Sequence, residues 1–320
     1  MKKCPVCTST SVFPEFESKS GIDSTKDNQK DEIYRYYECR ECLAEFINPQ
    51  PPQEEILEKY DIGYGNKSSV KRDVKENSIF VYLKIKRFEI FRGNASALTK
   101  FLFWPLIYTY DYKLRNIKKY FKDKSIRLLD FGCGDGTFIK TIDGLFNLKY
   151  HLGVDFSIES VKLCKEKGLT VSRSDAWSMN KFEDKFNLIT LTHVLEHIPN
   201  PREVINKIEE CMESGGILIM SLPNTSSIGK IIFGDKWAGY NTPYHLINYR
   251  RKTLECLLEG TRFKILEYKT QNFYIHSIDN ILYKKKFLGK LRIVNRFIRL
   301  LPSFLFSSYG CEQTIICIKE

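Results

Sequence analysis

Residues 128–138, with the sequence LLDFGCGDGTF, limit what this chain can fold into more than any other stretch. An apolar run ends in Asp130, and a helix is expected to begin after the glycines that follow. These glycines stand at alternate positions, Gly132, Gly134 and Gly136. A second apolar run ends in Asp155. This order is typical of a strand, a tight loop whose backbone approaches a nucleotide-like ligand, a helix, and an acid at the tip of the next strand.

Strand-like apolar runs recur along the rest of the chain, with helix-like segments between them. They cover residues 126–131, 150–155, 169–172, 186–192, 216–221, 263–270 and 312–319. The alternation predicts an α/β fold, with a Rossmann-like, seven-stranded, mostly parallel sheet and helices on both faces. Ligands in such sheets bind at the carboxyl ends of strands, which is where the glycines fall.

The composition along the chain suggests how the rest is organised. We expect a small N-terminal module at residues 1–50, followed by a linker and a basic, aromatic-rich helical segment at 51–125. The sheet domain then spans 126–320, with a cap region at 223–260 and a basic amphipathic insertion at 275–310.

The net charge of +11 is concentrated in two segments. Residues 61–125 carry +9 and residues 271–320 carry +5, whereas residues 126–270 are nearly neutral at +1. An anionic partner is therefore expected at these flanks.

No apolar run approaches the roughly 20 residues of a membrane span, and the sequence begins without a secretory signal. We therefore expect a cytoplasmic protein, whose cysteines are thiols or metal ligands.

Four cysteines near the N-terminus form two C-x2-C pairs: Cys4, Cys7, Cys39 and Cys42. Such pairs can supply four thiolates to one tetrahedral zinc ion. The polar residues 18–32 are interpreted as a loop that absorbs the long gap between the pairs. We expect a structural zinc ribbon that supports or caps the substrate site. Because residues 1–60 carry a net charge of −4, this module does not suit phosphate binding.

Two details of the glycine loop argue against a dinucleotide such as NAD. Position 137 is Thr, so the third glycine of G-x-G-x-x-G is absent. The acid Asp130 precedes the loop and would be an odd neighbour for a pyrophosphate. A cofactor with an amino group and a sulfonium but no phosphate suits this loop better, and S-adenosylmethionine has these groups.

Five stretches in order then establish a family resemblance: LLDFGCGDGTF (128–138), GVDFS (153–157), SDAWSM (174–179), FNLITLTHVLEHIPNP (186–201) and SGGILIMSLPN (214–224). With them, residues 126–222 resemble the class I S-adenosylmethionine-dependent methyltransferases. The branch is that of the ubiquinone-biosynthesis O-methyltransferases and the small-molecule and sugar methyltransferases. Sugar C-methyltransferases with an N-terminal zinc-binding module are similar in overall layout.

The resemblance implies roles for individual residues. The three glycines would lie against the methionine part of the cofactor, with Asp130 near its amino group. Asp155 would accept both ribose hydroxyls, and Phe156 would cover the adenine. The remaining implied contacts are those of Asp175 with the adenine amino group, of the Ala176 backbone beside it, and of Thr192 and His193 with the methyl-donor site.

The stretch HVLEH, residues 193–197, leaves further interpretations open. It matches H-x-x-E-H, a zinc-protease pattern, but Pro199 and Pro201 stop the continuous helix that a protease needs. It is also similar to the metal site of the small-RNA 3′-terminal 2′-O-methyltransferases, for which Glu196, His197 and His245 could remain. His193 replaces the first acid there, which speaks against magnesium. We favour the third interpretation, that Glu196 and His197 organise the loop structurally.

The acceptor is expected at residues 233–260, between the fifth and sixth strands. In the resembling branch this region covers the acceptor and carries a histidine, for which His245 is the matching position. A neutral imidazole there could take a proton from an acceptor hydroxyl or an activated carbon, or could be structural. The rings of Trp237, Tyr240 and Tyr244 could stack on a sugar.

Residues 281–306 contain no acid and place apolar residues at helical spacing, which predicts a basic amphipathic helix. It could dock on the domain, or it could bind a membrane surface near a lipid-linked substrate.

We expect a methyltransferase that acts on a small-molecule acceptor. The first candidate is a sugar of a surface-glycan precursor, which could be nucleotide- or lipid-linked. The alternatives are an RNA methyltransferase with a Glu/His metal site, although nucleic acid suits the chain less well, and a non-catalytic zinc-containing interaction protein.

Overall fold

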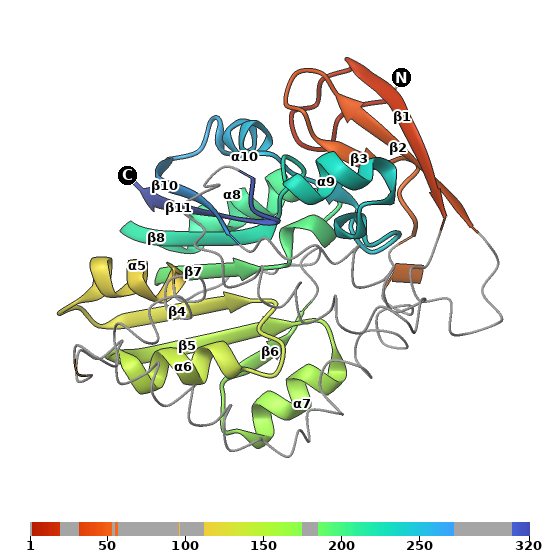
Figure 1. The fold of residues 1–320 in the computed structure, drawn as a ribbon. Helices are drawn as coiled ribbons and strands as arrows, with labels where there is room; N and C mark the ends of the chain where they lie inside the picture. The colour runs from red at the N-terminus through yellow and green to blue at the C-terminus, as the bar shows by residue number, and fades with distance from the viewer. Residues whose placement is uncertain are drawn as a thin grey trace.

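The computed structural model describes residues 2–19, 32–52, 55–56, 96, 112–174, 185–271 and 309–320. Two sheets make up its frame (Figure 1). The main sheet has seven strands in the order β10-β11-β8-β7-β4-β5-β6. Their bounds are β4 (Ile126–Phe131), β5 (Leu148–Asp155), β6 (Val171–Arg173), β7 (Phe186–Thr192), β8 (Met212–Pro223), β10 (Phe263–Gln271) and β11 (Glu312–Lys319). β11 runs antiparallel to both neighbours, and the remaining pairs are parallel.

Helices cover both faces of this sheet. They are α5 (Tyr112–Phe121), α6 (Thr137–Leu145), α7 (Ile158–Glu166), α8 (Pro201–Cys211) and α10 (Arg251–Leu258), while the short helix α9 (Ile228–Phe233) lies in the cap region. Three short 3₁₀ turns, η2 (Leu195–His197), η3 (Gly234–Lys236) and η4 (Ala238–Tyr240), lie in the loops after β7 and β8. The predicted Rossmann-like α/β fold is confirmed.

Alternate residues of the buried strands supply two separate cores, because side chains of a strand point to opposite faces. Leu128 of β4 and Ile219 of β8 pack with α5 and α6 on one face. Leu129 and Met220, their neighbours, pack on the other face with α8 and α10. The central strands are therefore buried on both sides, which explains why they read as continuous apolar runs.

The N-terminal residues form a second sheet in the order β1-β2-β3-β9, with bounds β1 (Val12–Lys19), β2 (Ile33–Cys39), β3 (Glu45–Ile47) and β9 (Ile247–Asn248). The last strand comes from the cap region, where Ile247 pairs with Phe46. In Figure 1 the red-to-orange strands β1, β2 and β3 of this sheet stand beside α9, on the side toward which the arrowheads of β4 and β7 point. The N-terminal module is thus joined by backbone hydrogen bonds to the region expected to cover the acceptor.

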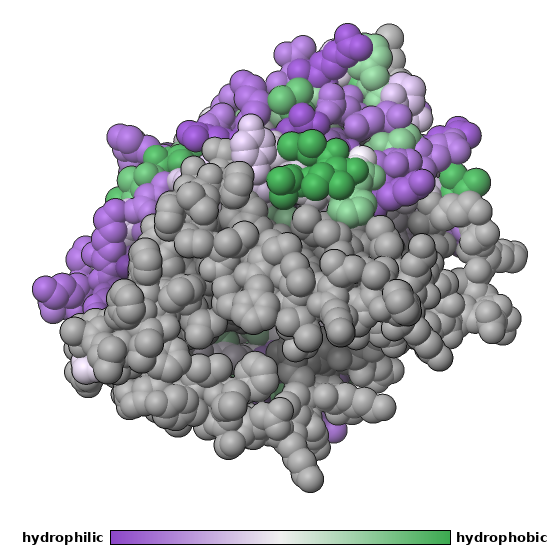
Figure 2. All heavy atoms as spheres, viewed as in Figure 1, coloured by the Kyte–Doolittle hydropathy of each residue, from purple (hydrophilic) through white to green (hydrophobic). Residues whose placement is uncertain are grey.

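Several predicted boundaries move by a few residues. β8 begins at Met212 rather than 216, and β6 covers Val171–Arg173 rather than 169–172. Most of the expected helical segment 51–125 and of the basic insertion 275–310 lies outside the described residues. Within the described part, no helix is both long and apolar enough to cross a membrane. Figure 2 shows hydrophobic surface where α9 lies, and Ile231 and Ile232 of that helix are exposed.

Candidate active site

The glycine loop joins the end of β4 to the start of α6. All three glycines have left-handed φ values, 70° at Gly132, 54° at Gly134 and 74° at Gly136. A Cβ at Gly132 would lie 2.2 Å from Cγ2 of Val194, and one at Gly136 would lie 2.2 Å from Cδ1 of Leu169. At Gly134 no atom of the described structure lies within 4 Å of that position. Packing therefore requires the outer glycines, whereas the middle one faces open space that a ligand can approach.

Asp155, at the tip of β5, holds this loop in place. Its Oδ2 accepts a hydrogen bond from the backbone N–H of Gly134 at 2.8 Å, and its Oδ1 accepts one from that of Ser157 at 2.9 Å. Burial raises the pKa of Asp155, and these amide hydrogen bonds oppose the shift. Each carboxylate oxygen can accept a further hydrogen bond, so the group can still bind a diol. Phe156 follows it and is half-buried.

Asp130 lies buried beneath the loop, near the end of β4. Thr190 of β7 donates its hydroxyl hydrogen to Oδ1 of Asp130 at 2.6 Å. Burial raises the pKa of the Asp130 carboxyl to about 7, although Thr190 and the nearby Lys113 ammonium lower it in part. The carboxyl is therefore close to its ionisation point at neutral pH, and a cation arriving beside it would favour the charged form.

Asparagine at position 130 should remove a pH dependence from the ligand-free protein. Because Asp130 ionises near pH 7 in the folded state and about pH 4 when unfolded, it lowers the stability of the wild type as pH rises through that interval. We expect Asp130→Asn to be more stable than wild type by about 4 kcal/mol at pH 8 and nearly equal to it at pH 4. Urea unfolding at both pH values measures this, and parallel pH profiles would contradict it.

The residues after β7 form a turn that packs on the glycine loop. The Thr192 hydroxyl accepts a hydrogen bond from Nζ of Lys113 at 3.1 Å. His193 has a left-handed φ of 54°, and its Nδ1 lies 3.2 Å from Oε1 of Glu196. Partial burial would lower the pKa of His193, but this interaction with Glu196 outweighs it and raises the pKa. A cationic imidazole is thereby favoured at the rim of the site.

Glu196, His197 and His245 come together behind this turn. One potential ligand atom from each lies within 4.8 Å of those of the other two. Burial would raise the pKa of Glu196, but His193, His197 and His245 outweigh it and hold it at about 2. Burial lowers the pKa of His245 to about 3, so its imidazole is neutral and is a weak base at neutral pH. The proposed role of His245 as catalytic base thus gains no support from its surroundings.

The protease interpretation of HVLEH fails on the backbone. The residues Leu195–His197 form a single 3₁₀ turn, and helix α8 starts anew at Pro201. His193 and His197 are therefore not carried on one continuous helix, as that pattern requires.

The aromatic side chains of the cap do not line an open acceptor site in this structure. Trp237 is 5% exposed and Tyr240 is 2% exposed. Their rings lie 5.4 Å apart, and the Tyr240 ring lies 5.0 Å from that of Tyr36 in β2. They form the core between the cap and the N-terminal sheet. Tyr244 is half-buried, and its carbonyl oxygen lies 2.7 Å from Nδ1 of His197. Stacking of these three rings on an acceptor stays a prediction.

The four N-terminal cysteines gather as the sequence predicts. Their Sγ atoms all lie within 4.8 Å of one another, with 3.5 Å for each of the pairs Cys4–Cys42 and Cys7–Cys39. A tetrahedral zinc site with Zn–S bonds of about 2.3 Å needs separations of about 3.8 Å. The hydrogen bond with Cys42 is the largest influence on Cys4 and lowers its pKa to about 5, which favours a thiolate.

The two halves of this cluster have the same backbone structure. In each, the residue after the second cysteine has a left-handed φ, 62° at Thr8 and 61° at Leu43. Its N–H donates to the carbonyl of the first cysteine, at 3.0 Å in one half and 2.8 Å in the other. Two equivalent turns that aim four thiols at one point fit a tetrahedral metal ion.

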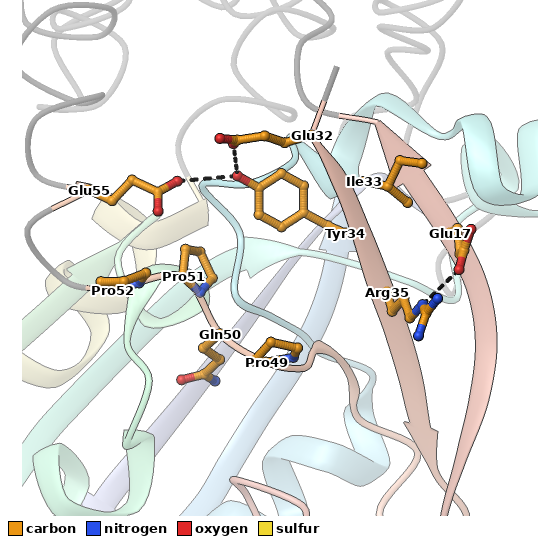
Figure 3. A pocket seen from close by; sticks show the side chains of 10 residues that line it. All are labelled: Glu17, Glu32, Ile33, Tyr34, Arg35, Pro49, Gln50, Pro51, Pro52 and Glu55. Carbon is orange, nitrogen blue, oxygen red and sulfur yellow. Dashed lines mark hydrogen bonds and ion pairs between the residues drawn. The ribbon is translucent and has the colours of Figure 1, made fainter. Parts of the chain in front are cut away.

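A separate cavity of about 540 Å³ lies between the N-terminal sheet and the segment after it (Figure 3). The hydroxyl of Tyr34 donates its hydrogen to Glu32 at 2.5 Å, and its oxygen lies 3.3 Å from a carboxylate oxygen of Glu55; Figure 3 draws both contacts. Glu17 is paired with Arg35 at 2.7 Å. With three carboxylates against one guanidinium, the lining does not suit a phosphate-bearing ligand.

Some site residues differ from those expected. Asp175 and Ala176 lie outside the described residues. The sequence does not indicate a role for Lys113 in the site, because it lies in the basic segment 61–125, where an anionic partner is expected. Thr190 was missed too, since it reads as one more residue of a buried strand. Lys113 and Thr190 each lie far from Asp130 in the sequence and come near it only in the folded chain, so no local sequence pattern indicates either contact.

Comparisons with known proteins agree with this geometry. A family model described as "Methyltransferase domain" matches residues 106–268. The mitochondrial ubiquinone biosynthesis O-methyltransferase of Candida albicans is 32% identical over 110 residues, which cover 32% of this chain and 34% of that protein. The ubiquinone biosynthesis O-methyltransferase of Glaesserella parasuis is 25% identical over 112 residues, which cover 32% of this chain and 47% of that protein. The matches thus span about a third to a half of these relatives.

A solved structure of an S-adenosylmethionine dependent methyltransferase from Mesorhizobium loti is also similar. It has 16% sequence identity and a TM-score of 0.40, and the match covers 61% of this chain and 91% of that one.

Proposed function

Because this chain belongs to the methyltransferase domain family, we propose that it transfers a methyl group from S-adenosylmethionine to a small-molecule acceptor. The observation that carries the proposal is the loop at the ends of β4 and β5. There, no atom of the described residues lies within 4 Å of a Cβ position at Gly134, while the carboxylate of Asp155 holds its N–H. Backbone that lies open beside a buried carboxylate suits a ligand with a diol and no phosphate.

The residues of the loop fit this donor one by one. Asp155 would accept the ribose hydroxyls, and Phe156 beside it would cover the adenine. Asp130, whose pKa lies near 7, would ionise when the cofactor's ammonium approaches. When bound, S-adenosylmethionine supplies an electrophilic methyl group on a sulfonium. Thr192 and His193 would line the path along which the acceptor reaches it.

Methyl transfer itself requires mainly that the acceptor be held in line. The acceptor atom would form a bond to the methyl carbon as the carbon–sulfur bond breaks with its electron pair left on sulfur, and a hydroxyl acceptor would release its proton to solvent water. Proximity and orientation supply much of the rate of such a displacement. The cap loop and η2, joined by the hydrogen bond from Leu246 N to Glu196 O at 2.8 Å, are the elements that would position the acceptor.

We further propose that the four-cysteine cluster holds one structural zinc ion. The module that carries these cysteines is hydrogen-bonded to the cap, so a metal ion bound there would stabilise the region expected to cover the acceptor. The Thr253 hydroxyl of α10 donates to the Cys42 carbonyl at 2.8 Å, and Tyr36 bonds Thr242 of the cap at 2.9 Å. The cysteine cluster is thus part of the module whose strand pairing and hydrogen bonds hold the cap in place.

The acceptor class is proposed from layout. We propose a sugar of a surface-glycan precursor, because the cap that would cover the acceptor shares one sheet with the N-terminal zinc module. Contact with an anionic membrane surface through the basic segments 61–125 and 271–320, near a lipid-linked acceptor, stays part of this proposal.

Methyl-labelled S-adenosylmethionine tests the assignment. The protein is incubated with the label and with cell extract divided into nucleic acid, protein, lipid and small-molecule fractions. We expect label in the small-molecule or lipid fraction, and no label with Asp155→Ala. Label in the nucleic-acid fraction would point to an RNA methyltransferase instead. No transfer to any fraction, with no binding of the donor, would point to a non-catalytic interaction protein.

A further inference from the structure

Tyr249 lies between the cysteine cluster and the turn that supports the glycine loop. It is fully buried and belongs to one apolar core with Cys4, Cys42 and Leu195. Its hydroxyl donates to the carbonyl oxygen of Leu195, the first residue of η2, at 3.2 Å. Burial raises the pKa of this hydroxyl well above its usual value, and the charges of Glu196, Cys4 and Cys42 raise it further. The same side chain therefore lies within range of charges at the cluster and at η2, and it binds η2 directly.

The main chain of Tyr249 is anchored at the end of β8. Its carbonyl oxygen accepts hydrogen bonds from the N–H and the hydroxyl of Thr225, which follows β8, at 3.2 and 3.1 Å. It also accepts one from Nε2 of Gln313 in β11 at 2.7 Å. These bonds fix the backbone to the main sheet, so the ring is held in place between the cluster and η2.

The turn η2 in turn supports the glycine loop. Val194, directly before η2, packs so closely on Gly132 that a Cβ there would lie 2.2 Å from Cγ2 of Val194. No side chain fits between them, so the position of Val194 limits the path of the loop that carries Gly134. A displacement of η2 would therefore change the surface on which the methyl donor is expected to lie.

The cysteine cluster is bound to the main domain through both of its halves. In the first half, Nε of Arg202 in α8 donates to the carbonyl oxygen of Val6 at 3.1 Å. The same guanidinium donates to two carbonyl oxygens near the end of α10 at 2.8 Å each. In the second half, the hydroxyl of Thr253 donates to the carbonyl oxygen of Cys42 at 2.8 Å. A change in the structure of the cluster therefore reaches the helices of the main domain directly.

Resting on the proposed function and on the proposed zinc site, we propose that Tyr249 is a positioning residue that couples metal binding at the cysteine cluster to donor binding at the glycine loop. A bound ion would hold the four thiolates at fixed positions and so restrict the two cysteine turns beside the Tyr249 ring. The hydroxyl of Tyr249 then keeps the carbonyl of Leu195, and with it Val194, in the position that the glycine loop requires. Coupling between two binding sites is reciprocal, so the donor must strengthen the binding of the ion by the same factor.

Two measurements on the wild-type protein test the coupling. S-adenosylmethionine is titrated by calorimetry into zinc-loaded protein and into protein stripped of metal, and circular dichroism checks the fold of each. We expect the stripped protein to bind the donor about tenfold more weakly, because one hydrogen bond can change an equilibrium constant by about that factor. Zinc is then partitioned against a chelator of known affinity, with and without saturating S-adenosylmethionine. The donor should tighten zinc binding by the same factor of about ten, and this second measurement needs only the loaded protein.

A conservative variant tests the role of the hydroxyl. Tyr249→Phe removes the hydroxyl and keeps the ring, so the protein should still hold zinc and still bind the donor. The coupling factor should fall to less than about twofold in both measurements. Tyr120→Phe is the matched control, because it removes a hydroxyl hydrogen bond of 3.2 Å to Glu267 among residues that pack on the opposite face of the main sheet. This control should keep the full factor.

The outcomes separate the coupling from the proposed function. Equal donor affinity with and without zinc in folded wild type, or no effect of the donor on zinc binding, would overturn the coupling whether or not the variant folds. A Tyr249→Phe protein that keeps the full factor would overturn the role of Tyr249, and a wild type that binds no zinc would overturn the whole inference. In all these cases a donor that still binds leaves the proposed function standing. Donor binding in neither metal state would contradict that function itself.

Discussion

Asp155→Ala should weaken the binding of S-adenosylmethionine by at least about 100-fold. The carboxylate holds the N–H groups of Gly134 and Ser157 at 2.8 and 2.9 Å, and it would also accept the ribose hydroxyls. Its loss therefore removes contacts to the donor and also releases the loop on which the donor would lie. Hydrogen bonds to a charged group contribute about 1.5–3 kcal/mol each, and 1.4 kcal/mol corresponds to a tenfold change in affinity. Isothermal titration with the cofactor measures the effect.

Two further variants define what this result means. Asp155→Asn keeps the shape and one acceptor oxygen, so its affinity should lie between those of wild type and alanine. Asp143→Ala removes an exposed carboxylate of α6 and should bind the donor as wild type does. Equal loss in the Asp143 and Asp155 variants, or none in either, would show that the site lies elsewhere.

Cys39→Ser should release the zinc ion and with it the N-terminal sheet. Cys39 ends β2 and is fully buried, and four thiolates hold structural zinc far more tightly than three. We expect a loss on the order of 5 kcal/mol of stability, or about 10 °C in midpoint temperature. Hydrogen exchange should also accelerate at Phe46 and Ile247, where β3 pairs with β9. Thermal unfolding with and without a chelator, together with exchange measured by mass spectrometry, follows both effects.

Cys311→Ser is the control for this experiment. Cys311 lies outside the cluster and is partly exposed, so its variant should keep zinc and respond to chelator as wild type does. A cysteine cluster without metal would give a different pattern. Chelator would then leave the wild type unchanged, and Cys39→Ser would lose no more stability than a buried thiol-to-hydroxyl change causes.

The main sheet could be predicted from the sequence because its signals are local. Each central strand is buried on both faces and therefore appears as a mostly apolar run, as in Ile126–Phe131 and Phe186–Thr192. The glycine loop could be predicted for a similar reason, since left-handed backbone at Gly132 and Gly136 restricts those positions to glycine. The two cysteine pairs could be predicted as a metal site because each has the C-x2-C spacing. In these cases the residues that identify the feature also build it.

What the sequence did not reveal depends on contacts between distant segments. Trp237 and Tyr240, which are expected at the acceptor site, also belong to one buried cluster with Tyr36 of the N-terminal sheet, and no local pattern indicates this packing. The carbonyls of Gly239 and Tyr244, which orient the imidazoles of His245 and His197, are backbone atoms that leave no signal in side-chain identity. The pairing of β3 with a two-residue strand of the cap is too short to predict from alternation.

Direct titration of the purified wild-type protein tests the central claim, that the loop after β4 binds a methyl donor. S-adenosylmethionine, S-adenosylhomocysteine and NAD are each titrated by calorimetry. We predict saturable binding of the first two at a shared site, in competition with each other, and no binding of NAD. Binding of NAD in place of the two adenosyl compounds, or binding of none of the three by folded protein, would contradict the assignment.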